Sequence, residues 1–187
     1  MDADEGIDVI GRSGHTTSVA SNRTTTKLQI AVYRAPMRSR DDEIDPQETI
    51  DRAMSAQLCG FGGKLTPAPR HLDEAVSAAE RQHDVRLARR VERFAAVAPG
   101  SLVWTRTSDG MFWVGRITGP WHYDASVAAE RADLVHVRAC QWADSPVAPH
   151  EVPAAVLATF DRGGRNFQQI HDQQVGPTSY RIFTERC

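Results

Sequence analysis

The pattern of apolar and polar residues divides the chain into a polar start and a folded remainder. Residues 1–27 are rich in serine, threonine and glycine and have no sustained apolar period, which predicts a flexible tail. From residue 28 onward, apolar positions recur with helix or strand periods. We therefore expect one folded domain over 28–171, followed by a C-terminal extension over 172–187.

Period-two alternation predicts strands, and a period of three to four predicts helices. Strands are expected at 28–36, 101–107, 111–119, 134–142 and 166–170. Asp109-Gly110 predicts a tight turn that joins the second and third of these into a hairpin. The end of the chain is expected to be loose or to add an edge strand over 179–185.

Helices are expected at three places. After a charged loop, Pro46 suits the first turn of a short helix, and a second short helix is expected at 150–160. Residues 72–97 predict one long amphipathic helix. Its inward positions are Leu72, Val76, Ala79, His83, Leu87, Val91 and Phe94. Its other face carries Arg81, Arg86, Arg89, Arg90 and Arg93, which we expect to be solvated and to form i,i+4 pairs.

Strands scattered among one long and two short helices, without a βαβ rhythm, predict an α+β fold. A small, partly closed mixed β-barrel with the helices packed outside fits this order best.

Composition narrows the function classes. The chain has 187 residues, of which 41% are hydrophobic and 25% charged, as in an ordinary folded protein. The net charge of −2 excludes a globally basic nucleic-acid binder, so phosphate binding would need a local basic face. All 22 basic residues except Lys27 and Lys64 are arginines, whose planar fork suits phosphates and base edges.

Three cysteines without a CxxC pair predict neither a disulfide framework nor a zinc site, and they favour a reducing cytoplasm. The chain has no apolar run of the roughly 20 residues that a membrane span needs, and its acidic start is unlike a signal peptide. We expect a cytoplasmic protein without a membrane partner.

Catalytic motifs are weak. The glycines of "GFGGK" lack the spacing of a phosphate-binding loop, and the seven histidines stand apart along the chain. The acids of "DDEID", residues 41–45, are either a metal-binding cluster of a nuclease or plain solvated charge. We expect no enzyme, no cofactor and no metal.

Residues 100–123, "GSLVWTRTSDGMFWVGRITGPWHY", hold three of the four tryptophans beside two arginines. In each strand of this predicted hairpin an aromatic ring and an arginine share one face, Trp104 with Arg106 in the first and Phe112 with Arg116 in the second. The rings are either the core of the barrel or the lining of a pocket. A pocket explains the arginines, because rings stack a flat ligand while guanidinium groups bind its edge or a phosphate.

The order of segments resembles the PUA-like modules of the EVE type, in the form found beside restriction endonucleases of the Mrr and McrB kind. The resemblance covers about residues 28–171. The residues that carry it are Gly100, Val103, Gly115, Ile117, Thr118, Gly119, Trp121, Tyr123, His136, Arg138 and Trp142. The chain departs from the pattern at Ser101 and Cys140, and Phe61 stands where relatives often have tryptophan. The chain contains no nuclease domain, so the resemblance implies no cleavage.

The resemblance implies a non-catalytic reader in which an aromatic pocket holds a modified, flipped base, with modified cytosine or adenine in DNA favoured. Restriction-modification or another defence function, with a separate nuclease or effector as partner, would follow. The implied base-pocket residues are Phe61, Trp104, Arg34, Arg106 and Asn166, with Trp113, Trp121 and Tyr123 as further rings. The implied backbone contacts are Arg38, Arg40, Arg162 and Arg165. Two alternatives stay open: a sensor of a nucleotide-like small molecule or interaction subunit, and a metal-dependent nuclease.

Overall fold

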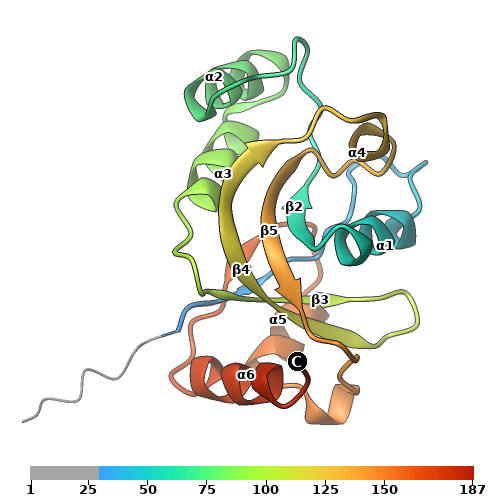
Figure 1. Ribbon diagram of the computed structural model, residues 1–187, viewed down its shortest axis with the longest axis vertical. Coiled ribbons are helices and arrows are strands. Elements are labelled where there is room, and N and C mark those ends of the chain that lie inside the picture. Colours follow the sequence, from blue (N-terminus) through green and yellow to red (C-terminus); the bar gives the residue numbers. More distant parts are fainter. Residues whose placement is uncertain (1–29) are drawn as a thin grey trace, which may run out of the picture.

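A computed structural model describes residues 30–187, and a curved six-stranded sheet forms its centre (Figure 1). The strands are β1 (Val32–Arg34), β2 (Leu58–Phe61), β3 (Leu102–Arg106), β4 (Phe112–Tyr123), β5 (His136–Trp142) and β6 (Gln168–Gln169). They lie in the order β2-β5-β4-β3-β1-β6, with β1 and β3 parallel and the other neighbouring pairs antiparallel. The expected α+β class is confirmed. The expected small, partly closed barrel is confirmed only in part, because the sheet is curved but β2 and β6 remain its edges and do not close (Figure 1).

The helices are α1 (Pro46–Ser55), α2 (Leu72–Gln82), α3 (Val85–Ala95), α4 (Val127–Arg131), α5 (Ala154–Asp161) and α6 (Val175–Thr184), with a 3-10 turn at Pro149–Glu151. α1 begins where the sequence predicts. Pro46 occupies its first turn, and the Asp45 carboxylate accepts a hydrogen bond of 2.9 Å from the Gln47 amide. The expected tail, residues 1–27, lies outside the described residues.

The single long helix expected over 72–97 is wrong, because α2 and α3 are separate. His83 has φ −127° and ψ −93°, and Asp84 then caps α3 by accepting a hydrogen bond of 2.7 Å from the Leu87 amide. The break changes which residues face inward. His83 is exposed, whereas Arg90 is buried.

The second strand of the hairpin is longer than expected and reaches Tyr123. Its register against β5 shifts between Ile117 and Trp121, which marks a bulge. Beyond the bulge Trp121 lies opposite Arg138, and Tyr123 lies opposite His136. The bulge therefore brings two rings to one end of β5 that a simple hairpin would leave in a loop.

The C-terminal segment is neither loose nor a strand. It forms α6, which contacts β1, β3 and β4. Ile182 and Phe183 are buried there, and the Ser179 hydroxyl accepts a hydrogen bond of 3.0 Å from the Trp104 indole. The helical spacing of these inward residues excludes an edge strand.

The sheet separates two cores. On one face, α1, α2 and α3 cover Phe61, Val103 and Ile117. On the other, α5 and α6 cover Trp104 and Val114, and Figure 1 shows these two helices at the opposite end of the molecule from α2. Because side chains alternate along β3 and β4, each strand contributes to both cores.

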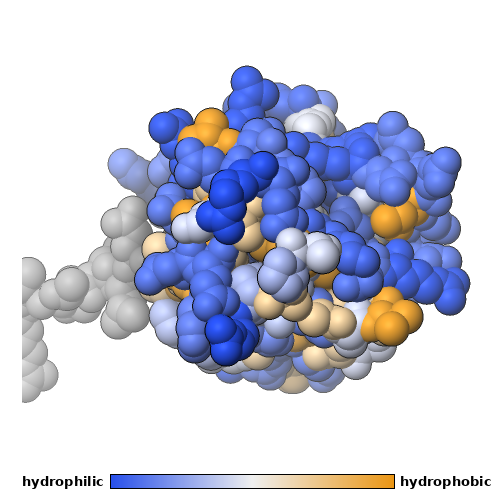
Figure 2. Space-filling model, turned by 90° about the horizontal axis from the view of Figure 1, so that it is seen from above, coloured by the Kyte–Doolittle hydropathy of each residue, from blue (hydrophilic) through white to orange (hydrophobic). Residues whose placement is uncertain are grey.

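The surface is mainly hydrophilic. Figure 2, seen from the α2 end, shows a face of polar and charged side chains with a few separate hydrophobic ones. Within residues 30–187, no helix combines the length and the apolar character that crossing a membrane requires.

Candidate functional site

A pocket of about 340 Å³ lies on the α3 side of the sheet, where segments far apart in the sequence meet. We call it the arginine pocket. Its lining residues are Arg38, Arg40, Asp41, Ile44, Phe61, Gly62, Gly63, Lys64, His83, Leu87, Arg90, Glu130, Asp133 and Arg165. They come from the loop after β1, the end of β2, the start of α3, the α4–β5 segment and the turn after α5.

The lining of the arginine pocket is rich in positive charge. Its cationic residues are Arg38, Arg40, Lys64, Arg90 and Arg165, and its acidic residues are Asp41, Glu130 and Asp133. The excess of cations is local, because the whole chain has a net charge of −2. Such a rim attracts anionic ligands and raises their concentration at the pocket.

A flat layer forms one wall of the pocket. The Arg90 guanidinium lies over the Phe61 ring, with 5.5 Å from its central carbon to the ring centroid. The Arg90 guanidinium also donates a hydrogen bond of 2.7 Å to the Asn166 side-chain oxygen, which fixes its plane. Burial lowers the pKa of Arg90, and the nearby Arg40 lowers this pKa further. A poorly hydrated, oriented guanidinium on a ring is a surface on which a planar ligand can stack.

Buried rings fix Phe61 from behind. His136 stacks against Phe61 at 5.2 Å between ring centroids, and Phe94 packs edge-on at 5.2 Å. Trp121 stacks on His136 at 6.1 Å, and Tyr123 meets it edge-on at 5.3 Å. The layer that ends at Phe61 is therefore rigid.

His136 is fully buried, and burial lowers its pKa to about 4, so its ring is neutral at pH 7. Its Nε2 donates to the Gly63 carbonyl at 3.1 Å. In the described part of the chain, neither His136 Nδ1 nor the Trp121 indole nitrogen has a hydrogen-bond partner. The neutral ring adds no charge to the pocket and serves to hold the glycine segment.

The Asp133 carboxylate joins two walls of the pocket. It accepts hydrogen bonds from the Ser39 hydroxyl at 2.6 Å and from the Gly63 amide at 2.9 Å. Asp133 has φ +43°, a left-handed conformation that aspartate tolerates better than most residues. A Cβ on Gly62 would lie 1.9 Å from this carboxylate, so a larger residue there would displace it. The glycines of the "GFGG" segment therefore allow a carboxylate to approach the backbone.

Carboxylates neutralise part of the rim. Asp42 pairs with Arg165, Glu130 pairs with Lys64 at 2.7 Å, and Asp84 lies 4.0 Å from Arg40. These pairs lie at the surface, where water screens them and makes them weak. An incoming phosphate could displace such a carboxylate at low cost.

The structure brings together several of the residues that the sequence suggested. Phe61, Arg38, Arg40 and Arg165 all line the arginine pocket. Asn166 reaches it through its bond to Arg90. Half-buried Trp121 and Tyr123 lie behind His136, outside the pocket lining, and the Tyr123 hydroxyl accepts a hydrogen bond of 2.8 Å from the Leu65 amide.

Trp104 lies on the opposite face of the sheet and is 0% exposed. It is a core residue bonded to Ser179 and cannot stack a ligand in the arginine pocket. Arg106, exposed and 5.5 Å from the Phe112 ring centroid, is also absent from the pocket lining. Half-buried Trp113 packs against the α3-side core without lining the pocket.

Two further arginines that the sequence suggested lie outside the pocket lining. Arg34 is buried, and its guanidinium donates to the carbonyls of Gly163, at 2.6 Å, and Gly164. It holds the turn that delivers Arg165 rather than facing the pocket. Arg162 is exposed and donates a bond of 3.3 Å to the Thr159 hydroxyl.

Sequence reasoning missed Arg90, which it placed on a solvated face. Reading Leu87, Arg90, Val91 and Phe94 as one inward set at spacings of three and four would have found it. Asp133 and Lys64 were also missed, and no local signal marks them, because tertiary contacts alone bring them to the pocket.

Two of the acids considered for a nuclease lie at the arginine pocket. Asp41 lines it, and Asp42 forms an ion pair with Arg165, which also lines it. Among residues 30–187, no group of three or more histidine, cysteine or acidic side chains is placed to hold a metal ion.

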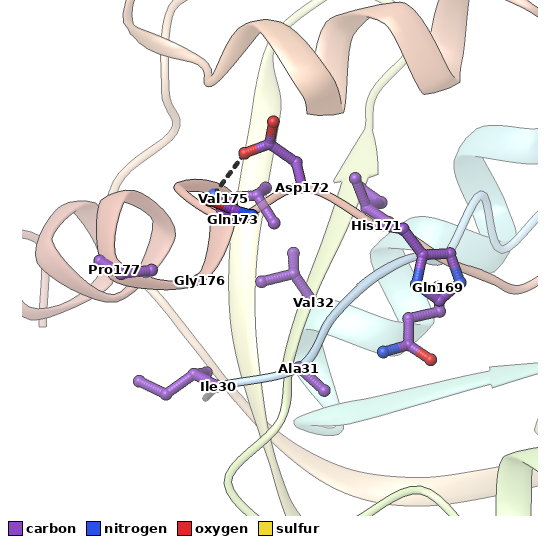
Figure 3. Close-up of a pocket in the computed structure, with 11 residues that line it drawn as sticks. Ile30, Ala31, Val32, Gln169, His171, Asp172, Gln173, Val175, Gly176 and Pro177 are labelled. Carbon is purple, nitrogen blue, oxygen red and sulfur yellow. Dashed lines mark hydrogen bonds between the residues drawn. The ribbon is translucent and has the colours of Figure 1, made fainter. Parts of the chain in front are cut away.

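A larger hollow of about 850 Å³ lies on the other side of β1, between Ile30 and the start of α6 (Figure 3). Of its lining residues, only His171 and Asp172 carry titratable side chains. The Asp172 carboxylate already accepts bonds of 2.8 Å from the Gln174 and Val175 amides, which cap α6. With that carboxylate engaged, we place no functional site there.

No known protein family and no curated protein matches the sequence. Several solved structures have a backbone similar to most of this chain, among them the following three. The YTH domain of Pho92, in complex with m6A, is 10% identical over 83% of this chain and 84% of that one, with a TM-score of 0.43. The YTH domain of Zygosaccharomyces rouxii MRB1, in complex with N6-methyladenosine RNA, is 9% identical over 83% and 88%, with a TM-score of 0.44.

The third is the protein Atu2648 from Agrobacterium tumefaciens, 11% identical over 81% of this chain and 92% of that one, with a TM-score of 0.34. At TM-scores below 0.5, these similarities are too distant to support an argument about fold or function.

Proposed function

We propose that this chain is a non-catalytic module that binds nucleic acid and holds one modified base in the arginine pocket. The observation that carries the proposal is the flat Arg90–Phe61 layer beneath a rim of cations. Guanidinium planes and aromatic rings both stack nucleobases, and rim arginines bind the flanking phosphates.

The size of the pocket favours a single base. A volume of about 340 Å³ lies near the lower end of the range for small-molecule sites, roughly 300 to 1,000 Å³. A flipped base with a small modification needs an enclosure of this order. The cost of unstacking it, a few kcal/mol, would be offset by the Arg90 layer and by phosphate contacts.

The acids of the pocket favour a base that donates hydrogen bonds. Asp133 uses one hydrogen bond on each carboxylate oxygen, and a carboxylate has about four acceptor sites. A carboxylate accepts from the exocyclic amino group of cytosine, and adenine also carries such a donor in its N6 amino group. We therefore favour a modified cytosine or adenine, in DNA, as the ligand.

The test is a binding titration with short oligonucleotides, single- and double-stranded, of DNA and RNA. The set carries methylated, hydroxymethylated or glucosylated cytosine, N6-methyladenine, or no modification. We expect an oligonucleotide that carries one of these modifications to bind at least tenfold more tightly than the same oligonucleotide without it.

The decisive variant is Arg90→Lys, which keeps the positive charge but removes the planar guanidinium on which a base would stack. Stacking is worth about 1 to 3 kcal/mol per base, so the preference for the modified base should fall about fivefold or more. Arg106→Lys is the matched control, because its guanidinium also lies over a phenylalanine ring but outside the pocket. Binding of free nucleotides with indifference to every oligonucleotide would favour a small-molecule sensor, and an Arg90→Lys variant with unchanged preference would refute the stacking layer.

A further inference from the structure

We propose that the exposed arginines of α3, Arg86, Arg89 and Arg93, bind the phosphodiester backbone and lead it away from the arginine pocket. The inference rests on the proposed function and extends it from the base to the path of the strand. Neither the motifs of the hairpin nor the residues lining the pocket point to this surface.

Helix geometry makes these arginines continuous with the pocket wall. At about 100° per residue, Arg86, Arg93 and Arg89 lie about 40°, 60° and 100° from Arg90 around the helix axis, all in the same direction. The buried Leu87 and Phe94 lie in the other direction from Arg90. Arg90, which lines the pocket, is therefore the inner edge of a stripe of arginines that turns outward to solvent. The three outer members are all exposed.

The charges of the stripe are available to a ligand. Among the described residues, Arg86, Arg89 and Arg93 take part in no ion pair or side-chain hydrogen bond. The i,i+4 pairs expected on this face are absent from α3 and occur instead on other segments, as Arg70–Glu74 and Arg181–Glu185. Paired arginines elsewhere show that the surface does not lack acids in general.

The acids near α3 are few. The helix carries four arginines and one glutamate in 11 residues, although the whole chain has a net charge of −2. Glu92 lies about 160° from Arg90 around the axis, beyond Arg89 at the outer edge of the stripe. Asp84 caps the helix and lies 4.0 Å from Arg40, at the pocket end. The stripe is thus a local positive surface that adjoins the rim.

The length of the stripe fits a polynucleotide. Arg86 and Arg93 are seven residues apart, which is about 10 Å along the helix axis at about 1.5 Å per residue. That distance corresponds to about three nucleotide steps at the rise of about 3.4 Å per step. Phosphates on the 5′ or 3′ side of a base held in the pocket could therefore meet these arginines in succession.

The test compares two double variants with equal loss of charge. Arg89→Gln with Arg93→Gln removes two members of the stripe, and Arg106→Gln with Arg181→Gln removes two exposed arginines outside α3. Glutamine is a good helix former, so α3 should remain folded, as circular dichroism can verify. The measurement is the slope of log affinity against log salt concentration for modified and unmodified oligonucleotides.

For the α3 double variant we expect the slope to decrease in magnitude by about 1.4 to 1.8, since each phosphate contact contributes about 0.7 to 0.9. Modified and unmodified oligonucleotides should weaken by the same factor, and the control double variant should keep the wild-type slope. An unchanged slope in the α3 variant would overturn the stripe. An equal decrease in the magnitude of the slope in both double variants would also overturn it, because the effect would then come from overall charge.

Failure of the stripe and failure of the proposed function remain distinguishable. If Arg90→Lys abolishes base preference while the α3 variant keeps its slope, only the stripe is refuted. If no oligonucleotide shows a base preference, the proposed function falls, and with it the stripe. Binding to a poly-glutamate peptide is measured as well. If the α3 double variant loses affinity for this peptide but keeps its affinity for oligonucleotides, the stripe binds an acidic protein and the inference is refuted.

Discussion

The two faces of the six-stranded sheet bury different polar groups. On the α5–α6 side, Trp104 and Val114 pack into an apolar core, and the indole N–H is satisfied by Ser179. On the α3 side, the sheet buries Arg138 and His136. The Arg138 guanidinium donates hydrogen bonds to the carbonyls of Phe94, Val97 and Gly119, at distances of 2.5 to 3.1 Å.

This difference shows that side chains one position apart along a strand enter different cores, as Val103 and Trp104 do. The same hairpin sends Trp104 to the apolar core and its neighbours to the polar face, because side chains alternate. Burial of polar groups is costly unless each finds a partner, so both sides need hydrogen bonds. Arg138 donates to backbone carbonyls on the α3 side, and buried Arg34, which lies over the Phe160 ring, does so on the α5 side. The α3 side, which buries His136 as well, holds the pocket.

The largest effect should come from breaking the apolar core. Trp104→Ala removes a fully buried ring and should lower the free energy of unfolding by about 3 to 5 kcal/mol, as measured by urea denaturation. Oligonucleotide binding by the protein that remains folded should stay at the wild-type level. Half-buried Trp113→Ala is the control and should cost less. A stable Trp104→Ala protein with lost binding would place this ring in the pocket after all.

Acid should destabilise the α3 side specifically. The pKa of His136 is about 4 when folded, against about 6.5 when unfolded, so the unfolded state binds more protons between these values. The stability that neutral His136 contributes is complete above pH 6.5 and declines by about 1.4 kcal/mol per unit below it, or about 3 kcal/mol at pH 4. Asp133 opposes this shift in pKa, whereas His83 and Arg90 reinforce it.

Urea denaturation between pH 7 and pH 4 measures this loss, and His136→Gln isolates it. Glutamine can still donate to the Gly63 carbonyl but does not titrate. The variant should therefore show a shallower decline than the wild type over this range. Parallel curves would mean that other groups cause the acid sensitivity.

The smallest effect concerns the rim. Asp42→Asn should release Arg165 for phosphate and raise oligonucleotide affinity by up to about fivefold, since a surface ion pair is worth about 0.2 to 1 kcal/mol. Stability should change little. Glu185→Gln is the matched control, because it also removes one negative charge and frees an arginine, Arg181, but on α6. Equal gains in both variants would indicate overall charge rather than the rim.

Local chemistry in the sequence was enough to predict much of the fold. Alternation located the hairpin and the strand at 134–142, and Asp45-Pro46 located the start of α1, because these signals act within a few residues. The same reasoning failed over 72–97, where the capping Asp84 was overlooked and two helices were merged into one. It failed again at the C-terminus, where the helical spacing of Ser179, Ile182 and Phe183 was not recognised.

What the sequence alone determined is the α+β class, most elements and the concentration of arginine near aromatic residues. Only the tertiary structure decided which arginines and rings meet. Phe61 and Arg165 are more than 100 positions apart, and Asp133 joins Ser39 to the glycine segment across the sheet. Strand order and the bulge in β4 set these contacts, and both depend on packing between segments that no local pattern encodes.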